Sequence, residues 1–128
     1  MKKTAIAIAI FLGIIALVST AMVLVLMRGM KDVLQEEIAE IDISTIEDGV
    51  YVGRYEHYRW TSKVEVVIAS GQIVSISLIE DHQIPNDITS AILFQRVIDA
   101  NALDVDMVTG GTVSSIAYLK AIEDALSE

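Results

Sequence analysis

The residues best suited to hold a charged ligand are the glycines and hydroxyls of residues 106–115, which read Asp-Met-Val-Thr-Gly-Gly-Thr-Val-Ser-Ser. After them, apolar residues recur at spacings of three and four, which predicts an amphipathic helix; these are Ile116, Leu119, Ile122 and Leu126. The first turn of a helix presents unpaired backbone N–H groups and the positive end of the helix dipole, and glycines let an anion approach the backbone. The segment could therefore hold a phosphate without a basic side chain.

The same segment also has a purely structural interpretation. Gly110-Gly111 is ordinary turn chemistry, and Thr112 could cap the helix by accepting a backbone N–H at its side-chain oxygen. Because short glycine motifs often match by accident, the surrounding sequence has to decide between the two.

The surrounding sequence resembles the FMN-binding domain family, which includes the flavin-carrying subunits of sodium-pumping NADH:quinone reductases and Rnf-type complexes. The strongest match is residues 104–115, Asp-Val-Asp-Met-Val-Thr-Gly-Gly-Thr-Val-Ser-Ser, followed by Ala-Ile-Glu-Asp-Ala-Leu at 121–126. Upstream, residues 48–53 (Asp-Gly-Val-Tyr-Val-Gly) resemble the family's opening strand, and 64–68 with 71–76 its next hairpin. The resemblance covers about residues 48–127.

Members of that family carry a [Ser/Thr]-Gly-Ala-Thr element, three residues after an Asp, whose final Thr is joined to FMN by a phosphoester. The resemblance maps the Asp to Asp106 and the acceptor to Thr112, and implies FMN as cofactor and a flavin transferase for maturation. The cofactor-binding residues that it implies are Thr112, Thr109, Gly110, Gly111, Ser114, Ser115 and Asp106. Two departures stand out: Gly111 replaces the usual Ala, and residues 80–86 keep only the proline of a Glu-Thr-Pro-Gly type element, so no ligand contact is assigned there.

Composition excludes several chemistries. The 128 residues contain no cysteine, which rules out disulfides, Fe–S clusters, thiolate zinc sites and a thiol nucleophile. The only histidines, His57 and His82, are not at metal-ligand spacing, so we predict no metal site and no catalytic residue. The first 31 residues hold four of the nine basic residues and none of the 18 acidic ones. The remaining chain is strongly acidic and is not expected to bind nucleic acid.

Residues 4–27 are 24 positions without charge or proline. At 1.5 Å per residue they span roughly 36 Å, enough to cross a membrane. Ser19-Thr20-Ala21 would serve as a signal cleavage site, but the apolar run continues beyond it, which favours an uncleaved anchor in contact with membrane lipid. Lys2 and Lys3 favour a single-pass protein of the cell membrane with its N-terminus inside and its domain outside the cytoplasm.

The remaining pattern predicts an α+β fold: a transmembrane helix, then a small antiparallel sheet with two packed helices, as in the FMN-binding domain. Residues 29–40 have helical periodicity and predict a stalk; strands are predicted at 50–58, 62–69 and 72–80, with Ser70-Gly71 as a hairpin turn. A helix up to about residue 100, capped by Asn86 or Asp87, a short strand at 105–108 and the final helix complete the fold. The predicted division is anchor 1–28, stalk 29–46 and FMN-binding domain 47–128.

Four aromatic residues lie on or beside the first predicted strand: Tyr51, Tyr55, Tyr58 and Trp60. Their rings could flank an isoalloxazine, but strand aromatics usually pack in the core or across strands. We therefore interpret them as packing residues and do not include them in the site.

Three classes of function fit these features. The favoured one is a membrane-anchored, covalent-flavin electron carrier that exchanges electrons with a membrane redox partner and is not a stand-alone enzyme. The second is a non-catalytic, bitopic interaction or sensor module in which the Gly-Gly loop is only a turn and no cofactor binds. The third is a hydrolase that uses the hydroxyl of Thr109, Thr112, Ser114 or Ser115 as its nucleophile. This class has the least support, because the chain lacks a Gly-x-Ser-x-Gly elbow.

Overall fold

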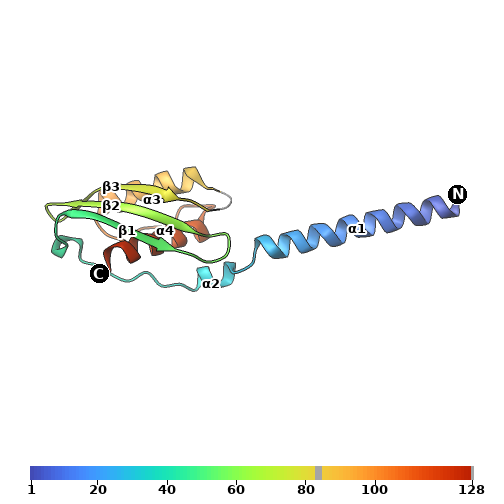
Figure 1. Cartoon of the computed structure of the whole chain (residues 1–128), viewed down its shortest axis with the longest axis horizontal. Coiled ribbons are helices and arrows are strands. Elements are labelled where there is room, and N and C mark those ends of the chain that lie inside the picture. The colour runs from blue at the N-terminus through green and yellow to red at the C-terminus, as the bar shows by residue number, and fades with distance from the viewer. Residues whose placement is uncertain (83–84, 128) are drawn as a thin grey trace.

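The computed structural model describes residues 1–82 and 85–127. A long helix α1 (Lys2–Leu26) is followed by a short helix α2 (Met30–Leu34) and a 3₁₀ turn η1 (Ile43–Thr45). Three strands come next, β1 (Gly49–Tyr55), β2 (Ser62–Ala69) and β3 (Gln72–Glu80), and then helices α3 (Asp87–Ala100) and α4 (Thr112–Leu126) (Figure 1). The predicted α+β class is confirmed.

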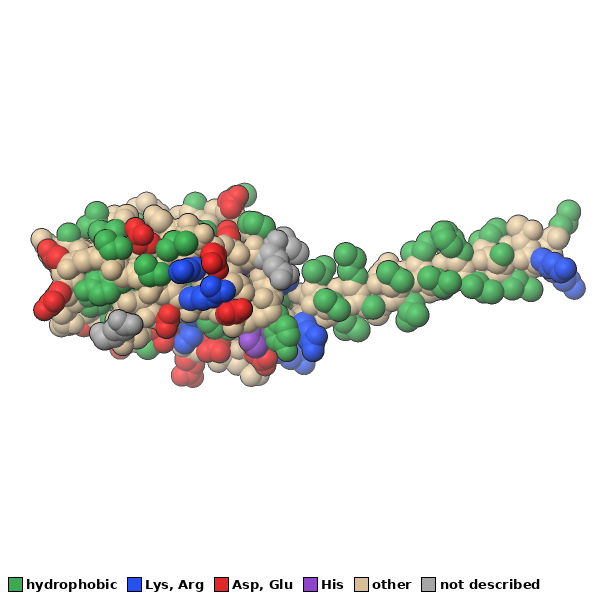
Figure 2. All heavy atoms as spheres, viewed as in Figure 1, with side chains coloured by type: hydrophobic (Ala, Val, Ile, Leu, Met, Phe, Trp, Pro, Cys, Tyr) green, Lys and Arg blue, Asp and Glu red, His purple; other side chains and the backbone are tan. Residues whose placement is uncertain are grey.

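Helix α1 extends away from the rest of the chain, and its surface is almost entirely hydrophobic (Figure 2). None of its residues is buried, and its most apolar stretch has a mean hydropathy of 2.8. An isolated helix of this length and composition is stable only when an apolar environment covers it, as a membrane does. The structure thus contains the predicted apolar helix. Its length and composition are those of a membrane anchor or of a signal sequence.

The three strands form an antiparallel sheet in the order β1-β2-β3. Strand β2 alternates strictly between buried and half-buried positions, so Val64, Val66 and Ile68 face the core. The hairpin between β2 and β3 turns at Ser70 and Gly71, whose φ values are 54° and 73°. Two successive positive φ values match the twist of the flanking strands, which is why this dipeptide makes a two-residue turn.

Helices α3 and α4 cover one face of the sheet (Figure 1), α3 against β3 and α4 against β1 and β2. Gly53 permits the close approach of β1 to α4, because a Cβ atom there would lie 2.7 Å from the Cα of Ala125. The core between the layers is apolar. Its buried members include Val64, Val66, Ile68, Ile73, Leu93, Val97, Tyr118, Leu119, Ile122 and Leu126.

The predicted helix over residues 29–40 is wrong beyond Leu34. Residues 36–42 form no helix or strand, although Ile38 and Ile41 repeat at a helix-compatible spacing. Tertiary contacts override that spacing: both side chains pack against the core, and the Ala39 N–H donates to Glu123 of α4 at 3.2 Å. The division of the chain at residues 28 and 46 stays a prediction.

Two strand predictions also need correction. The first strand ends at Tyr55 and not at residue 58, because the chain turns at Tyr58 (φ 52°) and the Trp60 N–H donates to the His57 carbonyl. The strand predicted at 105–108 is not formed. The Arg96 guanidinium on α3 instead binds the carbonyls of residues 106 and 107, at 2.9 and 3.2 Å, and so ties this segment to a helix.

Candidate functional site

The Gly-Gly loop forms a tight turn directly before α4. Gly110 has φ 81°, a left-handed conformation that favours glycine, and the Gly111 N–H donates to the Val108 carbonyl at 2.9 Å. The first helical hydrogen bond runs from the Ser115 N–H to the Gly111 carbonyl at 2.8 Å. The amides of residues 112–114 therefore have no acceptor within the helix, as the sequence predicted for a helix start.

Thr112 is the first residue of α4 and is exposed. The N-cap position belongs to Gly111, and within the described residues no side chain caps this helix. The interpretation of Thr112 as an N-cap therefore does not hold, and its hydroxyl has no capping role to keep it in place.

The other predicted site residues differ in their surroundings. Ser114 lines a cleft with Gly110, Gly111 and Thr112. Ser115 is completely buried; its hydroxyl donates to the Gly111 carbonyl at 2.7 Å and accepts from the Val108 N–H at 3.2 Å. Ser115 thus shapes the loop from inside.

Thr109 and Asp106 are exposed and are not among the residues that line this cleft. The Asp106 carbonyl binds the Arg96 guanidinium at 2.9 Å. Any role of these two side chains toward a ligand stays a prediction.

Gly111 has a steric explanation. A Cβ atom at this position would collide with the Thr89 Oγ1 and lie 2.9 Å from the Thr89 Cγ2, on the first turn of α3. Thr89 is itself buried, so it cannot simply rotate into solvent. The family that the sequence resembles usually has alanine at this position. In this chain α3 occupies the space of the alanine methyl group, which explains the glycine.

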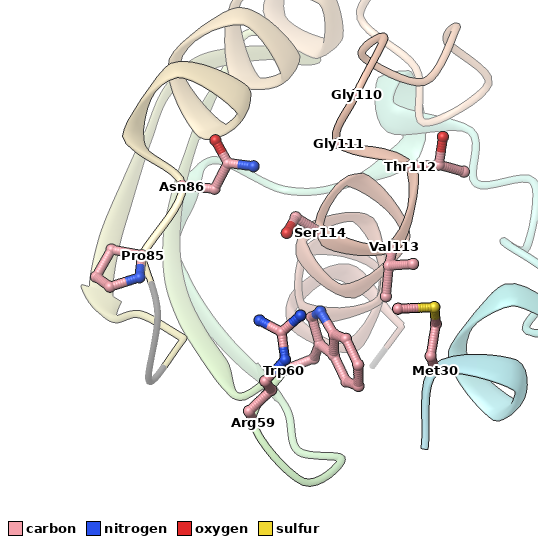
Figure 3. Close-up of a pocket in the computed structure, with 10 residues that line it drawn as sticks. All are labelled: Met30, Arg59, Trp60, Pro85, Asn86, Gly110, Gly111, Thr112, Val113 and Ser114. Carbon is pink, nitrogen blue, oxygen red and sulfur yellow. The ribbon is translucent and has the colours of Figure 1, made fainter. Parts of the chain in front are cut away.

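The cleft has a volume of about 410 Å³, within the ~300–1,000 Å³ of small-molecule sites. Figure 3 shows its lining: the first turn of α4, Pro85 and Asn86 before α3, Arg59 and Trp60 below Ser114, and Met30 beside Val113. Among these described residues only Arg59 is charged. A positive group in an otherwise acidic domain favours an anionic ligand at this position.

Sequence reasoning missed the part of the cleft wall that Arg59, Trp60 and Met30 form. Trp60 packs as predicted, with 1% of its surface exposed, yet it also lines the cleft. The Arg59 guanidinium carbon lies 4.2 Å from the centre of the Trp60 indole, a cation–π contact. Tyr55 pairs with Ser62 across β1 and β2, and the Ser62 hydroxyl donates to the Ala117 carbonyl of α4 at 3.3 Å, so the loop between these strands lies near the first half of α4. Only the register of the sheet shows this proximity.

A polar cluster joins the end of β3 to α4. The Tyr118 hydroxyl of α4 donates to the Asp81 carboxylate at 2.7 Å, and the His82 ring stacks on the Tyr118 ring, with centroids 4.5 Å apart. His82 Nδ1 lies 3.1 Å from the Thr61 carbonyl, and its Nε2 has no hydrogen-bond partner among the described residues. Burial lowers the pKa of His82 and raises that of Tyr118, so both rings are neutral at pH 7. Gln83 and Ile84, which follow in the sequence, lie outside the described residues.

The fold and the cleft define a small α+β domain in which the free amides of a helix start adjoin a partly apolar cleft. The model of the FMN-binding domain family matches residues 58–127, which include β2, β3, α3 and α4. A search among curated proteins finds no significant match. The chain belongs to the FMN-binding domain family, and FMN is its cofactor.

The cleft residues fit this cofactor. FMN combines a phosphate with a flat, aromatic isoalloxazine ring system. The free amides at the start of α4 suit the phosphate, and the half-buried Met30 and Val113 offer apolar surface to the ring system. No group of three or more His, Asp or Glu side chains within the described residues could hold a metal ion.

Proposed function

We propose that this protein is a membrane-anchored electron carrier whose FMN is attached by a phosphoester to Thr112. The observation that carries the proposal is the position of Thr112: its exposed side chain stands at the first turn of α4, on the rim of a cleft that fits FMN. A hydroxyl at this position is open to a flavin transferase and adjoins the free amides that bind phosphate.

Covalent attachment gives the proposed carrier a definite advantage. A single-pass protein with an extracytoplasmic domain would lose a dissociable cofactor by dilution, and a phosphoester prevents this loss. FMN, when bound, accepts and donates electrons, and the protein supplies binding, orientation and electrostatics. Arg59 contributes one positive charge to the cleft, and the buried Ser115 hydroxyl keeps the Gly-Gly loop in its binding shape.

Helix α1 supports the proposed membrane location, because it is exposed along its whole length and is apolar enough to cross a bilayer. We propose that it remains uncleaved, with Lys2 and Lys3 on the cytoplasmic side. We propose that one redox partner is a component of the same membrane, because the anchor keeps the domain at the membrane surface.

The two other classes of function have less support. A module without a cofactor would not need the cleft or the free helix end, and the family to which the chain belongs binds FMN. A hydrolase needs a base beside its nucleophile, yet His57 pairs with Asp32 and His82 binds the Thr61 carbonyl, and neither ring lines the cleft.

The test is co-expression of the full-length protein with a flavin transferase, followed by intact-protein mass measurement. The wild type should gain the mass of FMN less one water and should stay yellow after denaturation. Thr112→Val should abolish the adduct, and Thr112→Asn should also abolish it, since neither side chain offers a hydroxyl. Thr45→Val is the matched control and should keep the adduct, because it removes an exposed threonine hydroxyl that lies in η1, away from the cleft. A Thr112→Val protein that still carries flavin after denaturation would refute the assignment.

A further inference from the structure

The cleft wall includes a residue from the segment that joins α1 to the domain. Met30, the first residue of α2, lines the cleft, and its side chain lies close to Val113 and the Trp60 indole in Figure 3. Helix α2 lies outside residues 58–127, which the family model matches. A segment adjoining the membrane anchor thus supplies part of the binding surface.

Three contacts fix α2 against the domain. Val33 is completely buried in a cluster with Trp60, Ile116 and Ala117. Asp32 Oδ2 lies 3.0 Å from the Nε2 atom of His57. The position of Met30 is therefore set by packing and by a hydrogen bond.

The third contact is the close fit of Gly29, just before α2. Gly29 has φ 81°, and a Cβ atom there would collide with the Tyr58 ring and lie 2.7 Å from the Cδ2 of His57. A side chain at this position would both strain the backbone and push α2 away from the domain.

Arg59 connects the cleft to the end of α1 itself. Its Nε donates to the carbonyl of Leu26, the last residue of α1, at 2.7 Å, and its guanidinium stacks on the Trp60 indole. A cation is favourable at the negative C-terminal end of a helix, so both contacts hold the guanidinium in place. In the view of Figure 3 the guanidinium lies between Pro85 and the indole and faces the first turn of α4.

We infer that residues 26–33 are part of the FMN site: Met30 supplies apolar wall to the isoalloxazine ring system, and the end of α1 positions Arg59 to face a polar edge of the cofactor. The inference rests on the proposed function, because it assumes that FMN occupies this cleft. As a consequence, a shift in the position of α1 and α2 should change the environment of the flavin. The reason is that the contacts that hold α2 and Leu26 against the domain also place Met30 and Arg59 in the cleft wall.

The first test compares two glycine substitutions in the full-length protein, co-expressed with a flavin transferase and purified in one detergent. Gly29→Ala should displace α2, whereas Gly13→Ala is its matched control, because a Cβ atom at Gly13 meets nothing within 4 Å. Both proteins should carry covalent FMN by intact mass. In Gly29→Ala the visible circular dichroism of the flavin should weaken, and quenching of its fluorescence by iodide should increase, because the ring loses its wall. Gly13→Ala should match the wild type in both measurements.

The second test removes single contacts without moving the backbone. Met30→Ala should change the same two signals in the same direction, and Met22→Ala, on the exposed face of α1, should leave them unchanged. Arg59→Gln should weaken the binding of free FMN to protein made without the transferase, and Lys63→Gln is the control for the loss of one positive charge.

Wild-type dichroism and quenching in both Gly29→Ala and Met30→Ala would overturn the inference. If no protein, the wild type included, carries covalent FMN, the proposed attachment fails and the inference is decided by titration with free FMN. A Met30→Ala protein with an unchanged dissociation constant would then refute it.

Discussion

The steric conflict between α3 and the Gly-Gly loop leads to a prediction that can be tested without any cofactor. Gly111→Ala should destabilise the protein, because the new Cβ would collide with the Thr89 Oγ1 and lie 2.9 Å from the Thr89 Cγ2. Overpacking of a well-packed site costs about 1–3 kcal/mol. For a domain of this size we expect the melting temperature to fall by roughly 4–8 °C per kcal/mol.

Removal of the Thr89 side chain should relieve the conflict. Thr89→Ala alone should cost about 1 kcal/mol, because it leaves a small gap at a buried position. In the double variant the alanine methyl group fills that gap, so the loss of stability should be smaller than the sum of the two single losses by about 1–2 kcal/mol.

Gly110→Ala provides the matched control. Gly110 has a positive φ of 81°, but a Cβ atom there meets nothing within 4 Å. Its substitution should cost about 1–2 kcal/mol through backbone strain alone, and Thr89→Ala should not relieve that cost. The assay is thermal unfolding of the full-length proteins in detergent, with far-ultraviolet circular dichroism as the signal that reports unfolding. Losses from Gly111→Ala and Thr89→Ala that add within about 0.5 kcal/mol would refute the steric explanation.

Three further predictions concern pH and the membrane. Burial lowers the pKa of His82, whose ring also faces the charges of Asp81 and Arg59. Below pH ~6.5 the unfolded chain therefore binds a proton at His82 that the folded protein does not yet bind. The free energy of unfolding should therefore fall as the pH drops from ~6.5 towards the folded pKa, and His82→Phe should flatten this slope in denaturant titrations; an equal slope in both proteins would contradict it. The full-length protein should resist carbonate extraction from membranes, and a soluble mature form starting near Met22 would instead establish a cleaved signal. In intact spheroplasts the domain should be digested by added protease, and protection until lysis would reverse the proposed orientation.

The sequence predicts best those elements whose signals are local. The alternation of Val64, Val66 and Ile68 sets the core face of β2, and Ser70-Gly71 sets the turn that follows. The periodicity after Thr112 predicts α4 and its free N-terminal amides. Each of these features depends on residues within one turn, one strand or one helix, so it can be predicted without knowledge of the tertiary fold.

The features that the sequence hides depend on contacts between distant residues. Ile38 and Ile41 fit a helix, but they lie on an irregular segment because the core is within reach of both. The reason for Gly111 is Thr89, a residue 22 positions earlier on another helix. Arg59 and Met30 reach the cleft only through the strand register and the packing of α2, so no local pattern points to them.

The most direct test of the central claim is to locate the flavin on the chain. Trypsin cleavage after Arg96 and Lys120 releases one peptide, residues 97–120, that contains all four candidate hydroxyls of the loop, Thr109, Thr112, Ser114 and Ser115. Fragmentation of this peptide from flavin-loaded protein, by a method that keeps the phosphoester intact, should place the FMN adduct on Thr112 and leave residues 97–111 unmodified. An adduct on Thr109, Ser114 or Ser115, or a peptide without any adduct from protein that is yellow before denaturation, would contradict attachment at Thr112.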